Sequence, residues 1–413
     1  MNRQRSRSLR RAAVASAVLL SAHMIFPSPD AGYGLNYVVA DMREPAAISG
    51  NTACPQRMRM DISTAGGVNR QWSTSLGTNP VSILTADQTP AGQLNEIESA
   101  IEQSFAPWTG VSGSALTPSA LSPLAGTSVQ DACAVDEVNT ICFNQSDPAF
   151  ATGVLSFTRI ETADVIGEQV SASSPPSSFV GQILDADILI RPGDPTTQFA
   201  TPAALASNPT AYDLVSVLTH EVGHLFGMGH SGVWPAVMFP FVPPAGTFLG
   251  SRSTAQSPDA PLADDDRASV RTLYPGPGDS AYSGFISGRV LPANPLALSG
   301  QPAGTTGIFA AHVVAMDATT GAVVAGAVSG WSCSDPGPPV FDGSYNLQSL
   351  PVGPDQEYWL YAQPFDGPVE TGDVLEQTIL CRNTLTDPGW PAQFACVTPQ
   401  PMSNFSVTKV SGP

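Results

Sequence analysis

The chain has 413 residues, of which 42% are hydrophobic, and a formal net charge of −18. A chain of this length can form two domains, each with a core of its own. Because nucleic-acid binding needs a basic surface, the charge excludes nucleic acid as a partner.

The first 31 residues have the layout of a secretory signal peptide. Five arginines precede an apolar run from Ala12 to Phe26, and small residues follow near Ala31. The run is shorter than the roughly 20 residues that span a bilayer. We predict a signal peptide at residues 1–31, with an uncleaved anchor as the alternative. Residues 32–50 are then an N-terminal segment or a short propeptide.

These features predict a secreted or extracellular protein without a transmembrane segment after signal removal, and a cell-surface or periplasmic location stays open. Six cysteines in an exported chain indicate disulfides. We expect Cys133 and Cys142, which bracket a short stretch, to close a local loop. The pairing of the other four is left open; they are Cys54, Cys333, Cys381 and Cys396.

Three segments show helical patterns. Between Thr89 and Trp108, apolar residues recur every three or four positions and form one stripe. A second helix is predicted from Asp213 to Phe226. A third, short helix is predicted at 263–275, with acidic residues in its first turn. Strands are predicted at 57–64, 140–145, 153–160 and 183–190.

Residues 275–280, PGPGDS, form the best linker candidate. Beyond them the sequence predicts short strands. The segment 311–326 has two strands around a Thr-Thr-Gly turn, and 341–350 and 357–364 alternate with a period of two. This pattern predicts an all-β module.

Three of the five histidines fall within eleven residues, HEVGHLFGMGH at 220–230. On a helix, His220 and His224 lie on one face and can bind one ion. Gly227 permits a sharp turn that brings His230 back as a third ligand. Three imidazoles and a water form a catalytic type of zinc site, in which Glu221 is the predicted general base. The alternative is a set of buried histidines without a metal.

The motif HEVGHLFGMGH resembles the extended zinc motif of the metzincin metallopeptidases. Ser231, the VMFP that contains Met238, and DDDRASVRTLYP are most similar to the matrixin branch. The resemblance covers roughly residues 50 to 277. It implies an α+β catalytic domain with a mixed, mostly five-stranded sheet and an active-site helix. It also implies that Met238 forms an apolar floor beneath one catalytic zinc.

The sequence departs from the matrixin pattern at several positions. The latency cysteine segment of animal matrixins is absent. Asp187 and Leu189 occupy places where the family has ligands of a second zinc and of calcium, so only the catalytic Zn2+ is expected, with Ca2+ left open. Val242 stands where animal matrixins have a tyrosine in the specificity pocket, so their substrate preference is not transferred.

Residues 283 to about 367 resemble a carboxypeptidase regulatory-like β-sandwich, a spacer or attachment module. Trp331, Trp359 and Tyr361 are either binding residues or strand-face residues, and His312 is expected to be structural. The expected domains are 51–277, a matrixin-like zinc metallopeptidase domain, and 281–413, the β-sandwich.

The sequence therefore predicts a secreted zinc endopeptidase acting on protein or peptide substrates, with an unknown oligomeric state. One alternative is a non-catalytic surface or adhesion protein that retains a zinc site. A second is a zinc hydrolase of non-peptide amides or esters.

Overall fold

The structure is a computed structural model that describes residues 37–41, 59–62, 70–73, 83–124, 133–143, 150, 154–163, 166–179, 181–193, 197–234, 236–242, 245, 261–277, 280–298, 305–309, 311–330, 342–363 and 408–411. The predicted signal peptide lies outside these ranges. Trp331 and four cysteines, Cys54, Cys333, Cys381 and Cys396, also lie outside them.

A mixed sheet forms the centre of the first part of the chain. It has seven strands, and its main path runs β1-β7-β8-β6-β3-β5, with β2 beside the start of β8. Only β7 and β8 pair antiparallel; the other pairs are parallel. The strands are β1 (Tyr37–Asp41), β2 (Arg59–Met60), β3 (Gln71–Ser73), β5 (Ser122–Leu124), β6 (Thr140–Cys142), β7 (Ser156–Thr162) and β8 (Gln182–Ile190). The sheet thus has two strands more than the five that the resemblance implied, and β1, β3 and β5 were not among the strands predicted from the sequence.

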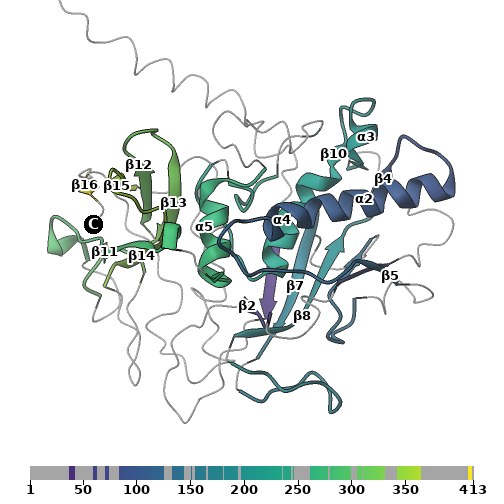
Figure 1. Cartoon of the computed structure of the whole chain (residues 1–413), viewed down its shortest axis with the longest axis horizontal. Helices are drawn as coiled ribbons and strands as arrows, with labels where there is room; N and C mark the ends of the chain where they lie inside the picture. The colour runs from purple at the N-terminus through teal and green to yellow at the C-terminus, as the bar shows by residue number, and fades with distance from the viewer. Residues whose placement is uncertain are drawn as a thin grey trace, which may run out of the picture.

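Two helices pack on one face of this sheet, as Figure 1 shows. Helix α2 (Pro90–Thr109) begins after Thr89, whose hydroxyl accepts a hydrogen bond from the Gly92 N–H. Its predicted stripe is buried except for its first member, Leu94, which is 37% exposed. Helix α4 (Leu214–Leu225) contacts α2 as well as strands β7 and β8. The predicted boundaries of both helices are confirmed.

The opposite face of the sheet is covered by a disulfide-closed loop. The predicted disulfide between Cys133 and Cys142 is present. Both cysteines pack against Phe157 of β7 and Leu189 of β8. Because side chains alternate along a strand, Phe157 points away from the face that carries Ser156 and Thr158. The loop and α4 thus lie on opposite sides of β7.

A small parallel sheet, which the sequence patterns did not predict, precedes α4. Its order is β10-β9-β4, with β4 (Ile83–Leu84), β9 (Phe199–Ala200) and β10 (Tyr212–Asp213). The short helix α3 (Pro202–Leu205) lies between β9 and β10 in the chain. Because β10 ends at the residue before α4, the small sheet fixes where the helix starts.

The C-terminal part consists of two antiparallel sheets. One pairs β11 (Gly284–Arg289) with β14 (Ser344–Leu350). The other has the order β13-β12-β15-β16, with β12 (His312–Asp317), β13 (Val323–Val328), β15 (Glu357–Gln363) and β16 (Thr408–Ser411). The short 3-10 helices η2 (Ser280–Tyr282) and η3 (Pro295–Leu298) flank β11. The strands predicted in this region are confirmed.

Helix α5 (Asp264–Leu273) lies between the two parts of the chain (Figure 1). It contacts β13 and β14 on one side. Its residue Ala268 belongs to the apolar cluster of the C-terminal strands, together with Val313 and Leu347. None of the helices in the described ranges is long and apolar enough to cross a membrane.

Candidate metal centre

Helix α4 carries the first two histidines of the motif. Asp213 begins the helix, because its carboxylate accepts a hydrogen bond from the Ser216 N–H at 2.9 Å. Every residue from Leu214 to Leu225 is buried. The helix is therefore enclosed on all sides, and its orientation is fixed by packing against the sheet and α2.

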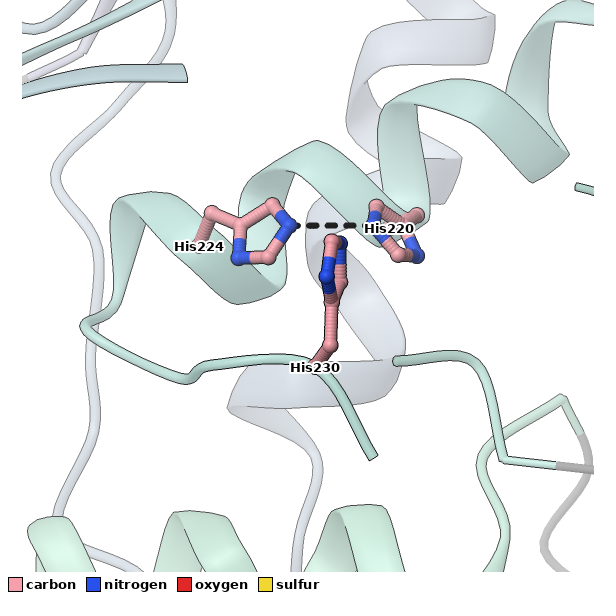
Figure 2. A group of neighbouring side chains, drawn as sticks. All are labelled: His220, His224 and His230. Atoms are coloured by element: carbon pink, nitrogen blue, oxygen red, sulfur yellow. Dashed lines mark hydrogen bonds between the residues drawn. The ribbon is translucent and has the colours of Figure 1, made fainter. Parts of the chain in front are cut away.

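A sharp turn at Gly227 ends the helix and returns the chain. Gly227 has a φ of 87°, a left-handed conformation that glycine adopts without strain. The N–H groups of Gly227 and Met228 donate to the carbonyls of His224 and Gly223, at 2.7 and 3.1 Å. Figure 2 shows the result: His230 projects from the returning loop toward the two helix histidines. The expected role of Gly227 is confirmed.

The ligand atoms of His220, His224 and His230 all lie within 4.8 Å of one another. The Nδ1 atom of His220 is 2.7 Å from the Val237 carbonyl, and that of His224 is 2.7 Å from the Met228 carbonyl. A carbonyl oxygen only accepts, so both Nδ1 atoms carry the proton. In the neutral rings, both Nε2 atoms then present lone pairs.

Those two Nε2 atoms are 3.0 Å apart. Two lone pairs at this distance repel unless a cation lies near both of them. In a tetrahedral zinc site with Zn–N bonds of about 2.0–2.1 Å, neighbouring nitrogens lie about 3.3 Å apart. The observed geometry is close to this value, and the backbone carbonyls fix the ring orientations. The three side chains therefore fit a zinc ion.

Electrostatics favours the neutral form of these rings. Burial lowers the pKa of His224 well below its ordinary value, and the neighbouring His220 and His230 lower it further. The hydrogen bond to the Met228 carbonyl opposes this shift. A neutral imidazole is the form that binds a metal, so the site needs little proton release to accept one.

Met238 packs against α4 at Gly223. A Cβ atom added to Gly223 would lie 2.2 Å from the Met238 sulfur, so the thioether packs directly on the helix backbone between the two histidines. Asp266 of α5 accepts hydrogen bonds from the N–H groups of Val237 and Met238, at 2.8 and 3.1 Å. The same short segment thus places Met238 against α4 and supplies the carbonyl that orients His220.

Glu221 projects toward β7. Its Oε1 atom accepts a hydrogen bond from the Ser156 hydroxyl at 2.6 Å, and its Oε2 atom accepts one from the Thr158 hydroxyl at 2.7 Å. The side chain has no exposed surface. Burial raises the pKa of Glu221 to about 7, and the two hydroxyl donors limit the rise. A neighbouring cation would lower this pKa.

Sequence patterns identified neither Ser156 and Thr158 nor the contacts of Asp266. Ser156 and Thr158 occupy alternate positions of β7, so they lie on the same face of the strand. Asp266 was expected only to complement the dipole of α5. In the structure it is 1% exposed and holds the backbone before Met238.

With this geometry established, the chain can be compared with known proteins. Residues 130–275 match the matrixin family. The matched segment contains β6 to α5 and the whole histidine motif. It supports a matrixin-like metallopeptidase in this part of the chain, and matrixins imply zinc and peptide substrates.

The similar curated proteins are plant metalloendoproteinases. Metalloendoproteinase 5-MMP of Arabidopsis thaliana is 33% identical over 147 residues, which cover 34% of this chain and 36% of that protein. Metalloendoproteinase 1 of Glycine max is 40% identical over 65 residues, covering 16% and 18%. Metalloendoproteinase 1-MMP of Arabidopsis thaliana is 37% identical over 99 residues, covering 21% and 24%. The chain thus spans about a third or less of the length of these relatives.

Proposed function

We propose that this chain is a secreted zinc-dependent endopeptidase, in which His220, His224 and His230 bind one zinc ion and Glu221 is the general base. When bound there, zinc supplies an acidified water and polarises the carbonyl of a peptide bond. The observation that carries the proposal is the arrangement of the three imidazoles, with two ring tautomers fixed by backbone carbonyls.

The role of Glu221 follows from its place on α4, one residue after His220. A carboxylate there can take a proton from water during attack on the peptide carbonyl and deliver it to the departing amine. Both of its oxygens accept hydrogen bonds from hydroxyls in the present geometry. For catalysis, one of these oxygens has to turn from its hydroxyl to the water.

One observation favours the alternative, a non-catalytic surface or adhesion protein with a zinc site. Glu221 is fully buried and both oxygens already have donors. That arrangement stabilises a buried carboxylate whether or not it takes part in a reaction. Both functions require zinc binding, but only the endopeptidase hydrolyses peptides.

The test compares the intact protein with its Glu221→Gln variant. We expect wild type to contain one zinc per chain and to cut a quenched-fluorescence peptide library, and a chelator to abolish the cleavage. Glu221→Gln should retain the zinc and lose roughly 10²- to 10⁴-fold in kcat/KM, the usual contribution of a general base. Zinc binding without hydrolysis in wild type would support the non-catalytic alternative.

The remaining parts of the chain are assigned as proposals. Residues 1–31 are proposed as a signal peptide, 32–50 as an N-terminal segment or short propeptide, 51–277 as the catalytic domain and 281–413 as a carboxypeptidase regulatory-like β-sandwich. Two antiparallel sheets around a shared apolar cluster support the last assignment. Edman sequencing of the exported protein tests the first two.

A further inference from the structure

A single carboxylate connects the loop of the third histidine to the C-terminal strands. Asp265, the second residue of α5, is 5% exposed. Its Oδ2 atom accepts a hydrogen bond from the Ser231 hydroxyl at 2.6 Å, and its Oδ1 atom accepts one from the Gly326 backbone N–H at 2.6 Å. Ser231 directly follows His230, and Gly326 lies in β13. Bonds to a carboxylate are among the stronger hydrogen bonds in proteins.

The position of β13 explains why its backbone is available to Asp265. In the described order β13-β12-β15-β16, β13 is the outer strand. An outer strand has backbone groups that no neighbouring strand satisfies. Gly326 uses such a group to bind α5, so the edge of this sheet is covered by the metallopeptidase part of the chain.

The same glycine makes a second, steric contact with the histidine loop. A Cβ atom at position 326 would lie 2.6 Å from Cγ2 of Val233 and 2.9 Å from Nε2 of His312. Val233 follows His230 by three residues and is buried. The backbone of β13 therefore approaches this loop at a distance that only glycine permits.

Two further contacts hold the C-terminal strands against α5. Ala268 is buried within their apolar cluster, and the hydroxyls of Thr272 and Ser349 lie 2.9 Å apart. Asp266, beside Asp265, holds the N–H groups of Val237 and Met238. Helix α5 thus contacts both ends of the segment that leads from His230 to Met238.

We propose that the C-terminal module is a structural part of the metal site. By binding Asp265 and packing on Val233, β13 holds Ser231 and, through it, His230 in the ligand position. His230 is the ligand that α4 does not carry, so its place depends on the loop and on what the loop contacts. Asp265 and Gly326 are positioning residues. This inference rests on the proposed zinc ligation by His230.

The first test is Gly326→Ala in the full-length protein. The added methyl group displaces Val233, so zinc affinity, measured by competition with a chelator, should fall about ten- to a hundredfold, as for other residues that orient ligands. The visible absorption of the cobalt-substituted protein should change as well, because it reports ligand geometry. Gly353→Ala is the matched control, since a Cβ atom there meets nothing within 4 Å.

A second substitution in the loop should rescue the first. Val233→Ala removes the nearer of the two atoms that the new Cβ atom would meet, and it leaves the contact with His312 Nε2 in place. The double variant Gly326→Ala with Val233→Ala should therefore recover part of the zinc affinity and shift the cobalt spectrum back toward that of wild type. If Gly326→Ala weakened zinc binding only by destabilising the whole fold, Val233→Ala would not restore the zinc affinity.

Asp265→Asn provides an independent variant if Gly326→Ala does not fold. It keeps the shape and one acceptor oxygen but loses the charge that both donors bind. We expect weaker zinc binding and a changed cobalt spectrum in the folded variant. If folded Gly326→Ala and Asp265→Asn bind zinc as wild type does, with the same cobalt spectrum, the inference is wrong while the proposed function stands. If the wild-type protein binds no zinc, both this inference and the proposed function are wrong.

Discussion

Ser156 on β7 donates a hydrogen bond to Glu221 on α4 across 2.6 Å, although 65 residues separate them in the chain. Thr158, two residues further along β7, donates to the other carboxylate oxygen at 2.7 Å. Because these two positions share one face of the strand, β7 holds the carboxylate at both oxygens. The direction in which Glu221 points is therefore set by the sheet as well as by the helix.

Thr158→Val should slow peptide hydrolysis without removing zinc. The substitution keeps the shape of the side chain and removes one hydrogen bond to a charged group, which contributes about 1.5–3 kcal/mol. Where that bond persists in the transition state, its loss corresponds to roughly a ten- to hundredfold decrease in kcat/KM. The matched control is Thr162→Val, on the same face of the same strand. Equal kcat/KM values for the two variants would show that the hydroxyl of Thr158 does not assist Glu221.

His224→Ala should lose both zinc and the stability that zinc provides. A ligand that binds only the folded state stabilises it by about 4 kcal/mol at a thousandfold excess over its Kd. A chelator should therefore lower the unfolding temperature of wild type but leave that of His224→Ala unchanged. Calorimetry with and without chelator measures both. A variant that still responds to the chelator would place the metal elsewhere.

Two neighbouring acids on β8 should make the stability of the zinc-free protein depend on pH. Burial raises the pKa values of Asp185 and Asp187 above their ordinary value of 3.8, and the mutual repulsion of the two charges adds to the shift of Asp187. An acid with a raised pKa binds its proton more tightly in the folded state than in the unfolded state. Its stabilising contribution is complete below pH 3.8 and is lost as the pH rises through the raised values.

The free energy of unfolding should accordingly decrease from about pH 4 upward. Asp187→Asn should reduce this slope, because the amide does not ionise and still accepts the Thr140 N–H bond now made at 3.0 Å. Urea denaturation at a series of pH values, in the presence of a chelator, measures the slope. An unchanged slope in Asp187→Asn would mean that a raised pKa of Asp187 does not contribute to the pH dependence.

Removal of residues 32–50 should increase the rate of peptide cleavage. Strand β1 pairs parallel with β7, in the register Tyr37 with Phe157 to Asp41 with Glu161, and so covers the outer edge of β7. An extended peptide that adds itself to this edge has to displace β1 first. Chains beginning at residues 32 and 51 should differ in KM more than in kcat. If both chains cleave with the same KM, β1 does not compete with substrate.

Much of the fold could be predicted where local sequence decides it. Asp213 and Thr89 begin helices because their side chains accept backbone N–H bonds, and Gly227 ends one because it adopts a positive φ. These signals are contained within a few residues. Helical spacing predicted that His220 and His224 share a face, the turn at Gly227 predicted the return of His230, and the structure brings all three together.

Other features depend on distant parts of the chain. Of the strand expected at 57–64, Arg59–Met60 is present and pairs with the first two residues of β8, whereas Asp61 and Ile62 are not in a strand. The other residues of this expected strand lie outside the described ranges. The composition of PGPGDS predicts a linker, but it gives no sign that Ala268 packs into the C-terminal cluster. The partners of Asp265 lie 34 and 61 residues away, and periodicity carries no information about them.

The close packing of Met238 on Gly223 restricts what the motif can become. The histidine motif itself places no constraint on residue 223, which is neither one of the histidines nor the glutamate. Yet even alanine there would meet sulfur at 2.2 Å and the ring of Trp108 at 2.9 Å. In a library randomised at residues 222 and 223 and selected for zinc binding, position 223 should therefore favour glycine, because any larger residue has to displace Met238, whereas position 222 should accept apolar side chains.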